Sequence, residues 1–220
     1  MPDVLRQYEA EIWQAISETF FMVGVSIVAA VLIGLPIGTY LFLCGKEKLL
    51  ENRVVYNILN LVVNTIRSFP FLLLVVFLIP FTRLIVGTAI GTVAATVPLS
   101  IIAIAHYARL VEQSLLDVPK GVIEAAVSMG ASVRRIIFSF LFVEARSGLV
   151  LGLTTSIVSF ISYSTIMGVV GGGGIGDFAI RYGYQQFKTD LMLYMILIMI
   201  VLVQFIQMIG TTAARWLDKR

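Results

Sequence analysis

The sequence predicts an all-α membrane protein, a helical bundle with five membrane spans. Of the 220 residues, 59% are apolar and only 13% are charged, and the mean hydropathy is +0.96. Soluble domains carry about 25% charged residues, so this chain is too apolar for an ordinary domain in water. Four uncharged runs have roughly the 20 residues that a helix needs to cross a bilayer, and a helix satisfies its own backbone hydrogen bonds there. These runs are residues 19–45, 84–106, 147–176 and 191–214.

The remaining span is less regular. Residues 54–82 are apolar apart from Arg67. We expect a helix that approaches along the membrane surface and turns into a span near residues 68–80. Pro36 and Pro98 lie inside apolar runs, where each removes a backbone hydrogen bond and should bend its helix. Bent helices suit a gated pathway, but packing alone also produces them.

Glycines four residues apart recur along these runs. This spacing lets helix backbones approach closely, either within one copy of the chain or between two copies. The pairs are Gly34 and Gly38, Gly87 and Gly91, Gly148 and Gly152, and Gly168 and Gly172.

The charged loops alternate in sign and so predict the orientation. Cytoplasmic loops of membrane proteins are enriched in Lys and Arg. The segment before the first span is acidic, whereas residues 46–53, 117–135 and 215–220 are basic. We therefore expect the N-terminus outside and the C-terminus inside. The net charge of +3 reflects this bias, so nucleic acid is not an expected partner.

Two further features limit the possibilities. Cys44 is the single cysteine, which excludes an intramolecular disulfide and a cysteine-based metal cluster. A cleavable signal peptide is not expected, because the N-terminus is acidic and the first apolar run is too long.

Residues 117–144 read DVPKGVIEAAVSMGASVRRIIFSFLFVE, which is typical of two helices separated by a glycine. Pro119 suits a first helical turn, and Asp117 before it favours the positive end of the helix dipole. Gly130 fits the left-handed position that ends a helix, and Ser132 could cap the next one. A docking surface and an ordinary connecting helix explain this pattern equally well. The first helix should expose small side chains and one carboxylate, from Glu124, Ala125, Ala126, Ser128 and Ala131.

The segment EAAVSMGA, residues 124–131, resembles the EAA loop of the membrane subunits of ABC importers. In that family Glu-Ala-Ala, three variable residues, Gly and an apolar stretch form a coupling helix that inserts into a cleft of the ATPase subunit. One departure is Val143, where the family often has proline, so we expect a less kinked start of the fourth span. The resemblance implies that the ATPase-coupling residues are Glu124, Ala125, Ala126, Ser128, Met129, Gly130 and Ala131.

Other motifs narrow the resemblance to the methionine-type importer permeases, and it covers nearly the whole chain. They are RSFPF at 67–71, IPFTRLIVGT at 79–88, Tyr163 with Ser164, GGGGIG at 171–176 and YGY at 182–184. The resemblance implies the type I ABC importer permease fold in a bacterial cell membrane. It also implies a homodimer that imports methionine, the L form first, with D-methionine or derivatives as further candidates. The implied partners are two copies of a cytoplasmic ATPase, which binds ATP and Mg, and an external substrate-binding lipoprotein. The chain itself would be neither an enzyme nor a cofactor-binding protein.

On this interpretation the chain divides into three parts. Residues 1–17 form an external segment, residues 18–215 the transmembrane domain with a coupling region at about 117–140, and residues 216–220 a cytoplasmic tail.

Several other residues could carry chemistry. Residues 171–176 lack the preceding strand of a phosphate-binding loop, and no GxxxxGK[ST] motif is present, so we expect no ATP site of that kind. Arg67, Arg109 and Glu112 should lie near the inner membrane boundary, where basic side chains snorkel to water. Arg109 and Glu112 could pair on one helix face. For all three, a structural role is favoured over one in substrate binding or gating.

His106 lacks a second ligand nearby and is expected to be packed, so we predict no metal site and no catalytic residue. Translocation-pathway candidates are Tyr163, Ser164 and Met167, although packing explains them as well. For Met192, Met195 and Met199, packing is the favoured explanation.

Other functions remain open at this stage. An ABC permease for another amino acid or small solute would share the same architecture. An ion-coupled secondary transporter should show buried ionisable residues or an inverted repeat, and neither is visible. A membrane scaffold that binds a partner without transport is a third alternative.

Overall fold

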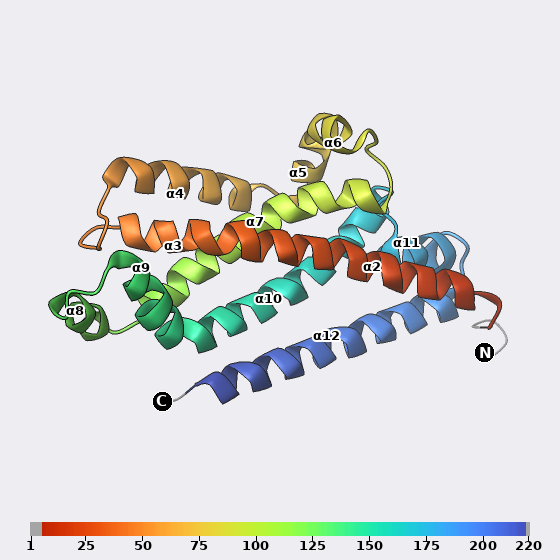
Figure 1. The fold of residues 1–220 in the computed structure, drawn as a ribbon. Helices are drawn as coiled ribbons and strands as arrows, with labels where there is room; N and C mark the ends of the chain where they lie inside the picture. The colour runs from red at the N-terminus through yellow and green to blue at the C-terminus, as the bar shows by residue number, and fades with distance from the viewer. Residues whose placement is uncertain (1–5, 219–220) are drawn as a thin grey trace.

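The computed structural model describes residues 6–218, and all regular structure in that part is helical (Figure 1). The fold is a bundle of long helices, as predicted. The start of the expected external segment, residues 1–5, and the end of the expected tail, residues 219–220, lie outside the described residues.

The first span is one continuous helix of 36 residues. It consists of α2 (Glu9–Ala29), a π-helical turn η1 (Ala30–Gly34) and α3 (Leu35–Cys44). The helix begins ten residues before the predicted apolar run and has no break at the expected boundary between residues 17 and 18. The π-helical turn comes just before Pro36, which has no N–H to donate. This proline is therefore accommodated by a local change in helical winding.

The region predicted to form the second span is a bent pair of helices. Helix α4 (Arg53–Ser68) and helix α5 (Phe71–Phe77) meet at 106°, and α6 (Ile79–Val86) follows. The prediction of a surface helix before the span was wrong, because α4 lies lengthwise beside α3 and also packs on α7 (Figure 1). Asn60 and Asn64 on its polar side accept hydrogen bonds from Arg109 of α7. Asn52 starts α4 by accepting hydrogen bonds from the backbone N–H groups of Val54 and Val55.

Helix α7 (Thr92–Leu116) is the centre of the bundle and packs against α2, α3, α4 and α10. The predicted span at 84–106 was displaced toward the N-terminus. Gly87 and Gly91 have φ of 83° and 103°, so the chain leaves the helical conformation between α6 and α7. These two glycines are therefore not a helix-packing pair.

Helix α8 (Lys120–Ser128) is followed by another long continuous helix. That helix comprises α9 (Val133–Arg135), the π-helical segment η2 (Ile136–Leu141) and α10 (Phe142–Val169). The predicted fourth span, 147–176, thus begins earlier and ends sooner. Its outer limit was wrong because Gly171, Gly173 and Gly174 have positive φ and end the helix.

The chain ends with three elements. These are the short helix α11 (Gly174–Phe178), the π-helical segment η3 (Ala179–Tyr184) and the last span α12 (Thr189–Leu217). Met195 of α12 is buried and Met192 packs against Gly183, which agrees with packing as the role of these methionines.

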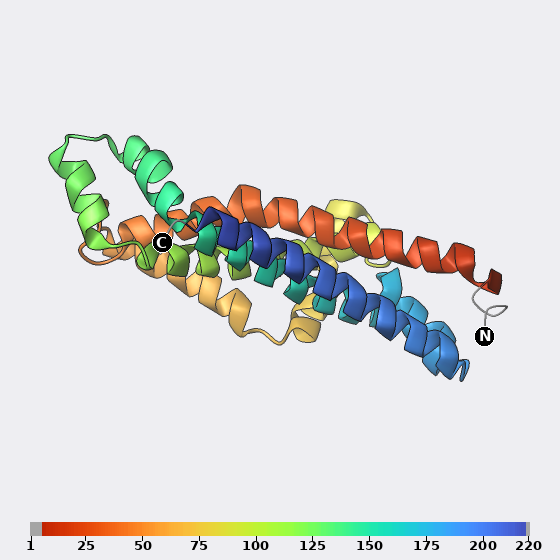
Figure 2. The same ribbon diagram turned by 90° about the horizontal axis from the view of Figure 1, so that it is seen from below.

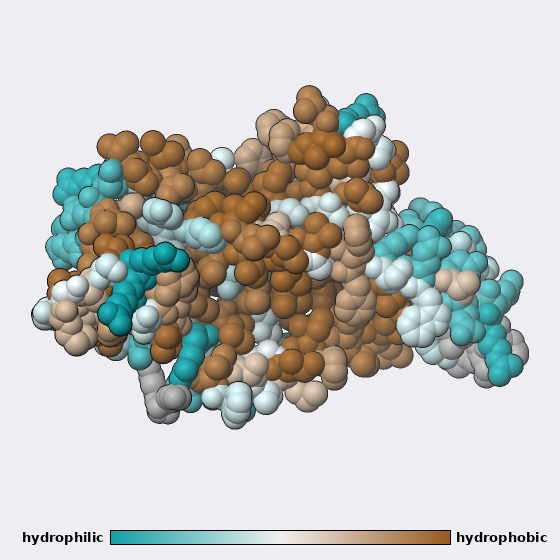
Figure 3. Space-filling view, in the orientation of Figure 1, coloured by the Kyte–Doolittle hydropathy of each residue, from teal (hydrophilic) through white to brown (hydrophobic). Residues whose placement is uncertain are grey.

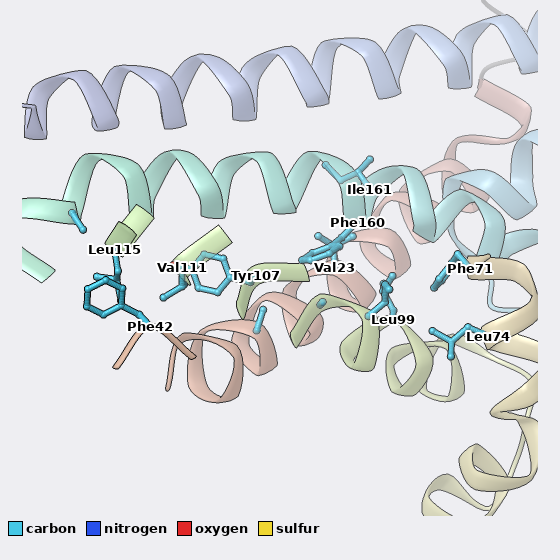
Figure 4. Close-up of a cluster of buried hydrophobic side chains, with 14 of the residues drawn as sticks. Val23, Phe42, Phe71, Leu74, Leu99, Tyr107, Val111, Leu115, Phe160 and Ile161 are labelled. Carbon is cyan, nitrogen blue, oxygen red and sulfur yellow. The ribbon is translucent and has the colours of Figure 1, made fainter. Parts of the chain in front are cut away.

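Large apolar side chains fill the space between α3, α7 and α10 (Figure 4). Glycine allows the closest approach there. A Cβ atom on Gly34 would lie 2.8 Å from the carbonyl oxygen of Ile104, and one on Gly148 would lie 3.1 Å from Oγ of Ser114. The glycine pairs at 34 and 38 and at 148 and 152 therefore serve packing within one copy.

The two ends of the bundle differ from its middle. Figure 3 shows a broad apolar band between two hydrophilic ends. The loop before α4, helix α8 and the end of α12 share one end, and the start of α2 and α11 share the other (Figures 1 and 2). We call the first the inner end, following the charge rule, and the second the outer end. The grouping of the three basic segments at one end is as the alternation of charges predicts.

Candidate functional site

Helix α8 and the turn that follows it project from the inner end of the bundle (Figure 2). We call residues 120–135 the inner hairpin. Gly130 has φ of 70°, and its N–H donates to the carbonyl oxygen of Val127 at 2.9 Å, so the predicted glycine break is confirmed. Ser132 does start the next helix, but through its carbonyl oxygen, which accepts from the N–H of Ile136 at 2.9 Å. The predicted side-chain cap was wrong, because the Ser132 hydroxyl makes no capping bond.

The exposed face of the inner hairpin consists mostly of the predicted coupling residues. Glu124, Ala125, Ser128, Met129 and Gly130 are exposed, and Ala131 is half-buried. The prediction that Ala126 is exposed was wrong, because this side chain is 0% exposed.

Ala126 instead belongs to the core cluster with Leu115, Val118 and Ile136. One turn earlier, Val122 also packs against this cluster. Residues four apart therefore form the inward face of α8. Val127 is 49% exposed on the outward side, and the sequence reasoning missed it. Exposed Val127 and Met129 on a helix outside the bilayer would have been a signal for a partner surface.

A cavity of about 550 Å³ lies between α8 and the loop before α4. Lys48 and Lys120 face it together with the carboxylates of Glu47 and Glu124. Burial lowers the pKa of the Lys48 ammonium, and the nearby charge of Lys120 lowers it further. The ammonium also lies 4.4 Å from the ring centroid of Phe42. The cavity therefore offers charges of both signs beside the exposed face of α8.

The three pathway candidates differ in their exposure. Tyr163 is half-buried, and its ring stacks on that of Phe71 with centroids 4.6 Å apart. Ser164 and Met167 are buried, and the Ser164 hydroxyl donates to the carbonyl oxygen of Ile161 at 2.7 Å. Met167 borders a cavity of only about 50 Å³ that Pro98 also lines. Of the three, only Tyr163 reaches the surface of one copy.

A polar cluster joins α4 to α7 within the membrane-spanning part. Arg109 forms the predicted pair with Glu112. The Arg109 guanidinium also donates to Oδ1 of Asn60 at 2.6 Å and to Oδ1 of Asn64 at 2.7 Å. The side chains of Arg109 and Glu112 are only 14% and 6% exposed. The expectation that Arg109 snorkels to water was therefore wrong, because α4 supplies two amide oxygens that hold the guanidinium inside the bundle.

His106 and the acidic residues give no indication of a metal centre. Within residues 6–218, no group of three His, Cys, Asp or Glu side chains could hold an ion. The His106 ring meets Phe160 edge-on with centroids 6.0 Å apart, and its Nε2 atom is buried and without a hydrogen-bond partner among those residues. Its packed position agrees with the prediction.

At the outer end, the glycine-rich segment is hydrogen-bonded to the first span. Oε2 of Glu18 accepts the N–H of Gly174 at 2.7 Å, and Oγ1 of Thr19 accepts the N–H of Ile175 at 2.9 Å. Both groups sit at the start of α11, where free N–H groups favour an oxygen acceptor. This segment therefore binds a carboxylate of its own chain.

Comparison with known proteins decides what kind of protein carries these features. The family described as "Binding-protein-dependent transport system inner membrane component" matches residues 30–220. The chain belongs to this family. It is the permease subunit, the membrane pore component, of an ABC transporter and a multi-pass protein of the inner membrane.

The permease has close relatives of nearly equal length. A "Probable D-methionine transport system permease protein" of Vibrio cholerae is 47% identical over 203 residues, covering 92% of this chain and 90% of the relative. The "Methionine import system permease protein" of Bacillus subtilis is 40% identical over 210 residues, covering 96% and 95%.

Solved structures agree with the fold. A chain of the MetNI methionine ABC transporter, described as inward facing, has a TM-score of 0.94 and 37% identity, covering 97% of this chain and 99% of that chain. A chain of an amino acid ABC transporter has a TM-score of 0.79 and 17% identity, covering 96% of each chain, a similarity that concerns the fold alone.

Proposed function

We propose that the permease takes up methionine as a homodimer, with two copies of a separate ATPase on its inner end and a substrate-binding protein on its outer end. ATP and Mg would be bound by the ATPase, and no covalent chemistry would occur in this chain. The names of the relatives support methionine as the substrate. The cavity beside Met167 is too small for an amino acid, which supports a passage formed between two copies.

The observation that carries this proposal is the two-sided character of α8. Its inward side is fixed to the bundle core through Ala126, whereas Ala125, Ser128 and Gly130 lie exposed on its outward side. Small side chains allow another protein to approach the helix closely. A force applied to the outward side would reach α7 and α10 through the buried contacts. ATP binding would then shift the population between an inward-open and an outward-open arrangement of the spans.

Gly130→Trp tests this role in the reconstituted complex with the ATPase and the binding protein. A Cβ atom at Gly130 meets no atom within 4 Å, so the indole would occupy the docking face and not the core. We expect import of labelled methionine to fall at least tenfold and the ATPase to lose its stimulation by the binding protein. The matched control is Leu84→Trp, since this side chain is 85% exposed on α6, a helix distant from α8.

Gly130→Asn, which tolerates the φ of 70°, controls for the loss of glycine at this position and should retain most of the import. Normal import and normal stimulated hydrolysis by Gly130→Trp would refute the assignment of the inner hairpin. Equal losses in Leu84→Trp would show that bulk, and not position, is responsible. A panel of labelled amino acids offered with the native binding protein tests the substrate, and preferential uptake of a polar amino acid would refute methionine.

A further inference from the structure

A polar stripe runs along one side of α4. At about 100° per residue, the side chains of Asn57, Asn60, Asn64 and Arg67 fall on one narrow strip of this helix. Exposed apolar side chains cover the opposite side, among them Ile58 at 57% and Val62 at 51%. Polar groups that faced lipid would be costly, so this stripe must face protein or water.

Two of the four stripe residues are accounted for within one copy, because Asn60 and Asn64 hold Arg109. Arg67 is not. None of the ion pairs and hydrogen bonds found within residues 6–218 involves its guanidinium, and the side chain is exposed.

Arg67 lies near the end of α4 that is far from the inner end of the bundle (Figure 1). It is the fifteenth residue of α4, and a rise of about 1.5 Å per residue places it roughly 21 Å along the helix from Arg53. It precedes the 106° bend between α4 and α5. The guanidinium is therefore far from the basic loop at the inner end of the bundle.

The polar cluster carries an excess positive charge. Arg67 and Arg109 together contribute two guanidinium groups, whereas Glu112 contributes one carboxylate, which is already paired with Arg109. Arg67 interacts electrostatically with all of these groups and with Tyr163. Tyr163, which also acts on Arg67, is half-buried and stacks on the buried ring of Phe71, so that Tyr163 offers an aromatic surface. A single unpaired cation next to an aromatic surface matches a ligand with one carboxylate and an apolar side chain.

We propose that the polar stripe of α4 lines the passage and that Arg67 binds the carboxylate of the amino acid as it passes. The inference rests on the proposed function, because it assigns a binding site to the substrate of that transport. The guanidinium donates two parallel N–H groups to the carboxylate, and the side chain of the amino acid lies against the ring of Tyr163. Because Arg109 is paired with Glu112, only the charge of Arg67 is available to the substrate.

Charge replacement at residue 67 tests the site in the complete complex. Cys44 is the single cysteine of the chain and is buried, so Cys44→Ala serves as the parent. In this parent, Arg67→Cys should slow methionine import about 10- to 100-fold, because the charge-assisted hydrogen bonds to the carboxylate are lost. Aminoethyl methanethiosulfonate then adds a cation at the thiol, and sulfonatoethyl methanethiosulfonate adds an anion. We expect the cation to restore most of the import and the anion to leave import as slow as in unmodified Arg67→Cys, or slower.

The position control is Val62→Cys, about 140° around α4 from Arg67 and 51% exposed. Modification of this chain is measured by intact mass spectrometry. We expect rapid modification in Arg67→Cys, slowed by millimolar methionine, and little modification in Val62→Cys.

Each alternative outcome has a definite meaning. Rapid import by unmodified Arg67→Cys, equal import after either reagent, or equal modification of the two thiols would overturn the inference. If Arg67 instead pairs with a carboxylate of the second copy, the charge at residue 67 would affect assembly of the dimer. Import by dimers that do assemble would then not depend on that charge, and the inference would be wrong. If the Cys44→Ala parent and the unaltered chain both import no amino acid with the binding protein, the proposed function itself fails.

Discussion

The inner hairpin and the outer glycine-rich turn, residues 171–178, both contain a glycine with positive φ, but they are held in opposite ways. Gly130 of the inner hairpin has open space around it, with no atom within 4 Å of an added Cβ. In the outer turn, a Cβ atom on Gly174 would lie 2.8 Å from Oγ1 of Thr19. The inner glycine is thus required only by the backbone conformation, whereas the outer glycine is required by conformation and by space.

This difference is consistent with a structural role for the outer turn and a partner-binding role for the inner hairpin. The outer turn is closed against α2 by bonds from Glu18 and Thr19, so its contacts are satisfied within the chain. The inner hairpin is anchored on one side only, by Ala126, and leaves the other side open. A second protein could bind to this exposed side. Because the opposite side is packed against the core, movement of that protein would be transmitted to the spans.

The largest effect should come from Gly176→Ala in the outer turn. A Cβ atom there would lie 2.5 Å from Cα and 2.6 Å from the carbonyl oxygen of Thr165. Both atoms belong to the backbone of α10, so no side chain can move aside. We expect the free energy of unfolding to fall by about 3 kcal/mol or more, measured by denaturation of the purified chain in mixed micelles. A loss below about 1 kcal/mol would show that the two backbones are not in close contact.

A smaller loss is expected for Gly174→Asn. Asparagine tolerates positive φ, so the change isolates the effect of space. The new side chain must displace Thr19, whose hydroxyl accepts the N–H of Ile175, and a buried donor loses its partner. We expect a loss of about 2 kcal/mol in the same assay. Retention of full stability would contradict the steric part of the comparison.

The sequence predicted the existence of the spans, the glycine break at Gly130 and the pairing of Arg109 with Glu112. Each of these depends on residues close together in the chain. The sequence did not predict the fastening of the outer turn, because Glu18 and Gly174 are 156 residues apart. It also misplaced the start of α7, since Gly87 and Gly91 interrupt a helix without lowering hydropathy enough to mark the break.

The candidate site was predictable to a similar degree. The composition of α8 indicated a small exposed surface, and most of it is exposed. Which of two adjacent alanines faces the core depends on how α8 rotates against Leu115 and Ile136, and that packing is invisible in the motif. The amide oxygens on α4 that hold Arg109 were missed for the same reason.

The two alanines provide a matched pair within the inner hairpin. Ala126→Leu adds three carbon atoms to a filled core position, and we expect a loss of about 1 to 2 kcal/mol in the stability of the purified chain. Ala125→Leu adds them to an exposed position, so stability should change by less than about 0.5 kcal/mol. Capture of the ATPase by the solubilised permease should show the reverse order, with Ala125→Leu the more impaired. Equal stability losses would show that α8 has no preferred inward side.

A smaller effect than that of Ala126→Leu should come from Gly130→Asn, the same substitution as at Gly174 but in open space. Asparagine can adopt φ near the observed 70°, and the side chain has no neighbour to displace. We expect the free energy of unfolding to change by less than about 1 kcal/mol, because only a mild backbone preference is lost. Gly130→Val should cost more than Gly130→Asn, since a β-branched residue is strained at positive φ. If the valine and asparagine variants were equally stable, Gly130 would not hold the left-handed conformation that separates α8 from the long helix. The conformation of the inner hairpin would then depend on a bound partner.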